Sequence, residues 1–344
     1  MLYGHGDDAY LQENPIVANF STNVYDAPEP QGLKEHLWEN WSLVNHYPEV
    51  LAESLRAKIT QYHRLSETNV LVLNGAEEGI HLLARMQPQQ TATICIPTFA
   101  EYADACQMYG HELTFVNWEQ LPDWNFTTSL AFICNPNNPT GVAVKVESIE
   151  DLLQRFPQTI FCIDEAFIDF TLAIDSHIPL LAKYDNLVVL KSLTKNFSIP
   201  GLRLGYVLAT PKVIQQMQAV KVAWSVNALA IEAGKYIFDH CLSQTTLPIE
   251  EMIQERTKWQ GILSTIPEFR WYPSDTHFFL GEVIGHSAAD LKTYLVNEHQ
   301  LLIRDTANFR GLTSHHFRLA SLSPKKNQLL TRALKAWASQ KPRK

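Results

Sequence analysis

From about residue 70 to residue 210, short apolar runs alternate with stretches whose apolar residues recur at helical spacing, such as residues 146–156. Several runs are apolar at consecutive positions, which is typical of parallel strands covered by helices on both faces. The pattern therefore predicts an α/β fold with a mostly parallel sheet. The predicted strands are Thr91–Pro97, Leu130–Pro136, Thr159–Asp164, Asn186–Leu190 and Leu204–Ala209.

The pattern changes after about residue 212, where long helical stretches precede shorter strand-like runs, as in an α+β domain. The predicted helices are Val213–Val222, Ala228–Cys241, Ile249–Ile266 and Lys326–Ala338. The predicted strands are His277–Val283, Leu301–Arg304 and His316–Leu319. The first 30 residues are rich in Pro, Asn and Gly, which favours an extended arm. We therefore expect an arm (1–30) packed on the small domain, a large domain (31–228) and a small domain (229–344).

Composition narrows the class of protein. The chain has 344 residues, 46% of them hydrophobic and 19% charged, which is ordinary for a soluble globular protein. Its formal net charge of −8 argues against nucleic acid as the main partner, since such proteins usually present a basic face. Anionic small-molecule substrates remain possible, because a few arginines can dominate the charge of one pocket.

No targeting or membrane segment is visible. Residues 1–8 lack the basic and apolar regions of a signal peptide, and no apolar run is long enough to span a bilayer. The cysteines are odd in number and scattered, so they indicate reduced thiols of a cytoplasmic protein, not disulfides or a metal site. They are Cys95, Cys106, Cys134, Cys162 and Cys241.

Polar side chains follow three of the predicted strands. They are the Asn135–Gly141 cluster, Asp164-Glu165 and Ser192–Lys195. In open α/β sheets, ligands bind beyond the carboxyl ends of the strands, so an amide, an acid and a lysine should meet at one edge. A cofactor with a pyridinium ring and a carbonyl group needs this set of side chains.

Lys195 can attack a carbonyl carbon if its amine points into a pocket, although an isolated lysine after a strand would usually be a surface residue. Its neighbours favour the pocket. Arg203, at the start of the next strand, can clamp a phosphate with its guanidinium fork, and the hydroxyls of Ser192 and Thr194 can donate to the same group. Asp164 ends a buried run and could pair with a protonated pyridine nitrogen, or it could cap a helix.

Two turn regions complete the candidate site. Asn138 could donate to the phenolic oxygen of the cofactor, or it could simply form a turn, as Asn137 should. Residues Gly75, Ala76 and Glu77 precede a helical pattern and offer free backbone N–H groups to a phosphate. A capped helix with glutamate in its first turn would look the same. Glu165 should point away from the site and be structural.

This constellation resembles the fold-type I enzymes of the class I and II aminotransferase group, which depend on pyridoxal-5′-phosphate (PLP), over nearly the whole chain. The matching segments are Tyr47-Pro48, Asn74–Glu78, Pro97–Tyr102, Asn135–Gly141, Asp164–Phe170, Ser192–Lys195 with Arg203, and Phe317-Arg318. The resemblance implies the aspartate aminotransferase-like fold, with a mostly parallel seven-stranded sheet in the large domain and a small α+β domain. It also implies a homodimer with shared active sites.

The resemblance assigns roles to individual residues. Lys195 would hold PLP as a Schiff base and act as general acid and base, while Asp164 would pair with the pyridine nitrogen. Asn138 would hold the phenolic oxygen and Tyr102 would stack on the ring. The phosphate would be bound by Gly75, Ala76, Glu77, Ser192, Thr194 and Arg203, and by Tyr47 of a second copy. Arg318 would bind the substrate α-carboxylate.

Within this group the chain resembles both histidinol-phosphate aminotransferases and L-threonine-O-3-phosphate decarboxylases of cobalamin synthesis. Four stretches are more similar to the decarboxylases: His5-Gly6 with Asn19–Asn23, Asp164–Phe170, Trp224–Ala230 and Ile303–Leu312. Both relatives take a small phosphorylated substrate, and the resemblance suggests Arg304 for its distal phosphate, with His5 and Asn23 helping. His5 could equally be a residue of the arm without such a role.

Phe167 bears on the reaction. Aminotransferases of the group usually carry tyrosine at this position, and phenylalanine removes a hydroxyl donor to the phenolic oxygen. The missing hydroxyl counts against efficient transamination. From the resemblance of the four stretches above, we expect decarboxylation of L-threonine O-3-phosphate to (R)-1-amino-2-propanol O-2-phosphate. The alternatives are a histidinol-phosphate or related aminotransferase, and a PLP-binding protein without turnover.

Overall fold

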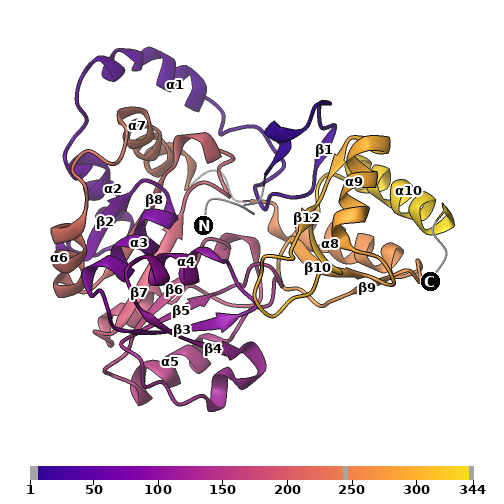
Figure 1. Cartoon of the computed structure of the whole chain (residues 1–344). Coiled ribbons are helices and arrows are strands. Elements are labelled where there is room, and N and C mark those ends of the chain that lie inside the picture. Colours follow the sequence, from indigo (N-terminus) through magenta and orange to yellow (C-terminus); the bar gives the residue numbers. More distant parts are fainter. Residues whose placement is uncertain (1–6, 243–246, 341–344) are drawn as a thin grey trace.

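The computed structural model describes residues 7–242 and 247–340, so His5 lies outside the described residues. The α-helices are α1 (Leu33–Glu39), α2 (Glu53–His63), α3 (Ala76–Met86), α4 (Glu101–Met108), α5 (Val146–Arg155), α6 (Pro211–Val220), α7 (Ala228–Tyr236), α8 (Ile249–Leu263), α9 (Ala288–His299) and α10 (Pro324–Gln340). In Figure 1 the chain forms a larger part, coloured indigo through magenta to salmon, and a smaller orange and yellow part that contains α8, α9 and α10.

The strands are β1 (Ala18–Asn19), β2 (Val70–Leu73), β3 (Thr91–Ile96), β4 (Glu112–Asn117), β5 (Leu130–Cys134), β6 (Ile160–Asp164), β7 (Leu187–Ser192), β8 (Gly205–Ala209), β9 (Phe269–Trp271), β10 (Phe278–Val283), β11 (Leu301–Leu302), β12 (Arg304–Asp305) and β13 (His316–Ala320). Seven of them form the large sheet in the order β2-β8-β7-β6-β5-β3-β4. All its pairings are parallel except those of β8. The mostly parallel seven-stranded sheet is therefore confirmed.

The large sheet is covered on both faces, and this explains its consecutive apolar residues. In β2, Leu71 and Leu73 join a core that includes residues of α3, α4 and α6. Val70 and Val72 join a second core, to which α2, α5 and α7 contribute. Each strand thus supplies both layers from alternate positions.

The smaller part contains a four-stranded antiparallel sheet in the order β12-β13-β10-β9. Strand β1 of the predicted arm pairs in parallel with β11, with Ala18 opposite Leu301, and Figure 1 shows β1 beside this part. Arm residue Phe20 continues the contact, since its N–H donates to Leu302 and its carbonyl accepts from Ala320. Helix α7 begins at the predicted boundary at residue 228, and it packs against α1 and α2 of the predicted large domain. The division of the chain at residues 30 and 228 remains a prediction.

Several elements differ from the sequence prediction. Strands β2, β4 and β9 were not predicted, because they are short or, in β4, carry polar residues on a partly exposed edge strand. The predicted run 301–304 is divided at Ile303 between two sheets. The predicted helix 228–241 ends as an α-helix at Tyr236 and continues as one π-helical turn, Ile237–Cys241. No helix within residues 7–242 and 247–340 is long and apolar enough to cross a membrane.

Candidate active site

A cleft of about 480 Å³ lies at the carboxyl ends of the central strands and is lined by three parts of the chain. The large sheet contributes Asp164 at the end of β6, and the loops after β5 and β7 contribute Asn138 and Lys195. The arm contributes residues 21–25, and β13 contributes Arg318. The three strand ends converge because parallel neighbours finish at the same edge of the sheet.

Lys195 is half-buried in this cleft, three residues after the end of β7. Its carbonyl accepts a hydrogen bond of 2.9 Å from the N–H of Tyr25, which attaches the arm to the lysine loop. Burial lowers the pKa of the Lys195 ammonium to about 8, and the positive charges of Arg318 and Arg203 act in the same direction. About a tenth of the amine is therefore neutral and nucleophilic at pH 7, far more than for an unperturbed lysine.

Asp164 is the last residue of β6 and is buried. Its Oδ2 accepts from the Tyr102 hydroxyl at 2.7 Å, and its Oδ1 accepts from the Ala166 N–H at 2.9 Å. Burial raises the pKa of Asp164, and these two hydrogen bonds oppose the rise. The carboxylate is thus fixed at the floor of the cleft, where a cationic ring nitrogen would be its natural partner.

Tyr102 is fully buried, and its ring stacks on Phe132 with 5.1 Å between the centroids. Burial and the neighbouring Asp164 raise the pKa of its hydroxyl, which keeps the hydroxyl protonated as a donor. Tyr102 also lines the cleft. Stacking on a cofactor ring stays a prediction, while the hydrogen bond to Asp164 is a contact that the sequence did not indicate.

A candidate anion-binding site lies at the amino end of α3. Gly75 precedes the helix with a φ of +78°, and a Cβ atom there would lie 2.8 Å from Nη2 of Arg203. Glycine therefore allows the guanidinium to lie against the first turn of α3. Arg203 forms an ion pair of 3.5 Å with Glu77, and both side chains are partly exposed. Ala76, Ser192 and Thr194 line the cleft beside them.

Arg318 is buried and connects the small sheet to the other two parts of the cleft. Its Nη1 donates to Oδ1 of Asn138 at 2.5 Å, and its Nη2 donates to the carbonyl of Ser21. Burial lowers the pKa of Arg318 to about 9, and the charge of Arg304 adds to this effect. A buried guanidinium of this kind is expected to bind an anion strongly.

Three further predicted site residues, Arg304, Asn23 and Tyr47, lie in three different places. Arg304 is buried on β12, directly opposite Arg318 of β13, and its Nη2 donates to Asn308 at 2.9 Å. Asn23 is buried in the cleft, and neither polar atom of its side chain has a partner among the described residues. Tyr47 lies elsewhere, with 85% of its surface exposed and its ring 5.3 Å from that of Trp224.

The family model "Aminotransferase class I and II" matches residues 15–335, which is nearly the whole chain. The chain belongs to this aminotransferase family. It is 30% identical to a threonine-phosphate decarboxylase of Salmonella typhimurium, over 92% of this chain and 90% of the relative. It is also 30% identical to histidinol-phosphate aminotransferase 2 of Idiomarina loihiensis, over 87% of each chain. The predicted family is thereby confirmed.

The solved structures agree with this family. The L-threonine-O-3-phosphate decarboxylase of Porphyromonas gingivalis superposes with a TM-score of 0.91 at 35% identity. The match covers 94% of this chain and all of that chain. The predicted fold type is thus confirmed together with its family.

The cofactor of this aminotransferase-family chain is PLP, and the cleft fits it in three respects. A buried carboxylate with a raised pKa, Asp164, suits a protonated ring nitrogen. Gly75 lets the guanidinium of Arg203 approach the amino end of α3, and this cation beside the free N–H groups of a helix start suits a phosphate. Lys195, with its lowered pKa, suits the carbonyl carbon.

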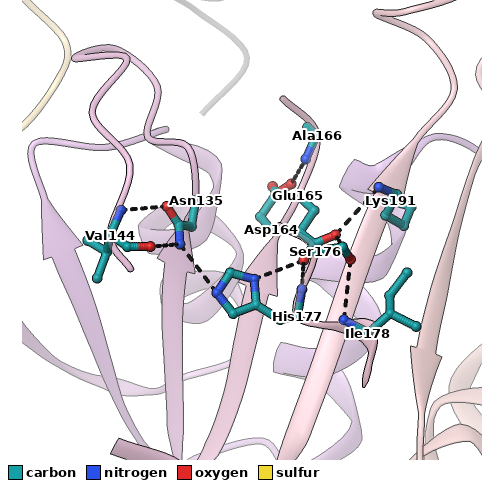
Figure 2. Close-up of polar contacts among 9 residues, drawn as sticks. All are labelled: Asn135, Val144, Asp164, Glu165, Ala166, Ser176, His177, Ile178 and Lys191. Carbon is teal, nitrogen blue, oxygen red and sulfur yellow. Dashed lines mark hydrogen bonds and ion pairs between the residues drawn. The ribbon is translucent and has the colours of Figure 1, made fainter. Parts of the chain in front are cut away.

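Some cleft residues were not found from the sequence. Asp7 and Tyr25 of the arm line the cleft, and the Ser21 carbonyl binds Arg318. A backbone carbonyl leaves no signal in residue type, so the role of Ser21 could not be read from the sequence. The sequence also did not indicate a buried polar network next to Asp164. In this network, shown in Figure 2, Glu165 contacts His177 and Lys191. Glu165 points away from the cleft, as predicted.

Proposed function

We propose that this chain is a PLP-dependent enzyme that decarboxylates L-threonine O-3-phosphate to (R)-1-amino-2-propanol O-2-phosphate. When bound, the cofactor withdraws electrons from the bond at the substrate Cα that stands perpendicular to its ring. Lys195 holds the cofactor and moves protons at Cα, while Asp164 keeps the ring nitrogen protonated. The Gly75–Glu77 turn, with Ser192, Thr194 and Arg203, binds the cofactor phosphate, and Tyr102 and Asn138 hold the ring.

The observation that carries the proposal is the pairing of Arg304 with Arg318. Directly opposed residues of antiparallel strands point their side chains to the same face, so both arginines lie on one face of the small sheet. The charge of Arg304 lowers the pKa of Arg318, which agrees with this proximity. Threonine phosphate presents a carboxylate and a phosphate on neighbouring carbons, and two adjacent cations suit both anions. Histidinol phosphate has no carboxylate, so in the alternative reaction a carboxylate would come only from the second substrate, 2-oxoglutarate.

Asn23 supports the same substrate, because its unpartnered amide can donate to an anion bound in the cleft. Phe167 is buried, lines the cleft and packs edge-on against Phe278 at 4.9 Å. It offers no hydroxyl to the cofactor, which favours decarboxylation over transamination in our proposal.

The test uses two substrates in parallel. Purified protein loaded with PLP is incubated with L-threonine O-3-phosphate, and release of CO2 is followed. The same protein is given histidinol phosphate with 2-oxoglutarate, and glutamate is measured. We expect CO2 without glutamate. Glutamate without CO2 would instead support the alternative, a histidinol-phosphate aminotransferase, which is the name of one relative. Inactivity with every phosphorylated amino acid tried would favour a PLP-binding protein without turnover.

We also propose a homodimer in which Tyr47 reaches the phosphate site of the second copy. Large apolar side chains are exposed around the short helix Trp41–Asn45, and soluble monomers rarely expose many of them together. They are Trp38, Trp41, Val44, Tyr47, Val50 and Trp224. Light scattering should give twice the chain mass, and replacing Trp41 and Trp224 by serine should give the single mass.

A further inference from the structure

The side chain of Asn135 closes the loop that carries Asn138. Its Oδ1 accepts from the N–H of Val144 at 2.9 Å, and its Nδ2 donates to the carbonyl of Val144 at 2.8 Å, as Figure 2 shows. Because the two backbone groups have fixed roles, the orientation of the amide follows from them. Nδ2 of Asn135 then lies 3.4 Å from Nε2 of His177, so this nitrogen of His177 must accept.

The other ring nitrogen of His177 therefore carries the hydrogen, and it donates to Oε1 of Glu165 at 2.9 Å. Glu165 also accepts from the backbone N–H of His177 at 2.6 Å and from the Ser176 hydroxyl at 2.7 Å. Burial would raise the pKa of Glu165, but the charge of Lys191 and the bonds from His177 outweigh it and hold the pKa at about 2. The carboxylate is thus a permanent acceptor.

This network joins the ends of three adjacent strands. Asn135 follows β5, Glu165 follows β6, and Lys191 lies in β7, with its Nζ 3.4 Å from Glu165. The backbone continues the connection, since the N–H of Asn135 donates to Asp164 at 2.9 Å. His177 comes from a separate loop and is fully buried between the ends of β5 and β6.

The same strand ends include Asp164 itself and lead into the loops that hold Asn138 and Lys195 in the cleft. A side chain that bridges Asn135 to Glu165 therefore adds to the backbone hydrogen bond that holds the start of the Asn138 loop beside Asp164. In the proposed function, Asn138 binds the phenolic oxygen of the cofactor ring and Asp164 binds its ring nitrogen. A shift of either residue would change how the ring is held.

We propose that His177 is a positioning residue, which fixes the geometry of the cofactor ring by bridging Asn135 and Glu165. This inference rests on the proposed function, because it assigns Asn138 and Asp164 to the ring. His177 does not itself line the cleft, so it would act through Asn135 and Glu165. The bridge to Asn135 is the part that matters, since Glu165 keeps its backbone and Lys191 partners without the imidazole.

Two polar substitutions of His177 test its hydrogen bonds to Asn135 and to Glu165 separately. In His177→Asn, the amide nitrogen can take the place of Nδ1 and donate to Glu165, but the side chain is too short to reach Asn135. In His177→Gln, the amide oxygen can reach the place of Nε2 and accept from Asn135. The matched control is His111→Gln, because His111 is also buried, bonds the Ala84 carbonyl at 2.7 Å and does not line the cleft.

The measurements are the dissociation constant for PLP and the pH midpoint of the visible absorption of the loaded protein, with the melting temperature as a stability control. We expect His177→Asn to bind PLP roughly tenfold more weakly, the effect of leaving one buried donor unsatisfied, and to shift the pH midpoint. His177→Gln should restore both values to nearly those of the unchanged protein. His111→Gln should alter only the melting temperature.

Three results would overturn the inference. They are unchanged values in His177→Asn, equal losses in the asparagine and glutamine variants, or losses that simply follow the melting temperature in all variants. A failure of the unchanged protein to bind PLP would instead refute the proposed function. The two failures are therefore distinguishable.

Discussion

Arg318 donates a hydrogen bond from Nη1 to Oδ1 of Asn138 over 2.5 Å, and this contact joins the small sheet to a loop of the large sheet. It occupies the carbonyl oxygen of the Asn138 amide, so the amide nitrogen is oriented as the donor available to the cleft. The predicted carboxylate-binding residue and the predicted ring-binding residue are thereby coupled. A substrate anion that binds Arg318 would act on both.

Replacement of Arg318 by lysine should separate charge from geometry. Lysine keeps a positive charge but has no planar fork, so it cannot bind Asn138, the Ser21 carbonyl and a carboxylate together. We expect the KM for threonine phosphate to rise roughly tenfold or more. Steady-state kinetics measure this, and an unchanged KM would remove Arg318 from the substrate site.

Arg304→Ala should weaken substrate binding without loss of the cofactor. Arg304 is buried and its side chain lies on the same face of the sheet as that of Arg318. Loss of a well-desolvated charge pair with the substrate phosphate should cost about 2–5 kcal/mol. Calorimetric titration of threonine phosphate measures the loss, and the visible absorption shows whether PLP is retained. Unchanged affinity would contradict the role of Arg304.

The capture of PLP by cofactor-free protein should depend on pH. Only the neutral amine of Lys195 can attack a carbonyl carbon, and its pKa is lowered to about 8. The capture rate should therefore rise about tenfold for each pH unit below 8 and level off above it. Stopped-flow absorbance measures the rate. Lys195→Ala should show neither this phase nor the visible band, and a variant that kept the band would refute the assignment.

Tyr102→Phe should remove one of the two hydrogen bonds to Asp164. The pKa of Asp164, already raised by burial, should rise further because a donor to its charged form is lost. Asp164 would then lose its charge at a higher pH on acidification, and PLP should dissociate earlier in an acid titration. The lost bond should also lower the unfolding free energy by about 1 kcal/mol. An acid titration identical to that of the unchanged protein would contradict this role.

Much of the fold could be predicted from residue patterns. The consecutive apolar residues of β5, β6 and β7 indicated buried parallel strands, and the polar residues after them marked the ligand-binding edge. The edge strand β4 was missed, because a strand with a partly exposed face and polar ends has no continuous apolar run. The π-helical turn after Tyr236 has no sequence signal of its own.

By itself, the sequence determined which chemical groups this protein can offer and at which edge they lie, because Asp164 ends a strand and Asn138 and Lys195 follow the two neighbouring strands. Tertiary structure decided which of those groups touch. Arg318 meets Asn138 across 180 positions, Tyr102 meets Asp164 across 62, and His177 bridges two strand ends. Contacts of this kind depend on how distant segments pack, and burial then sets the pKa of each group, so neither follows from local residue patterns.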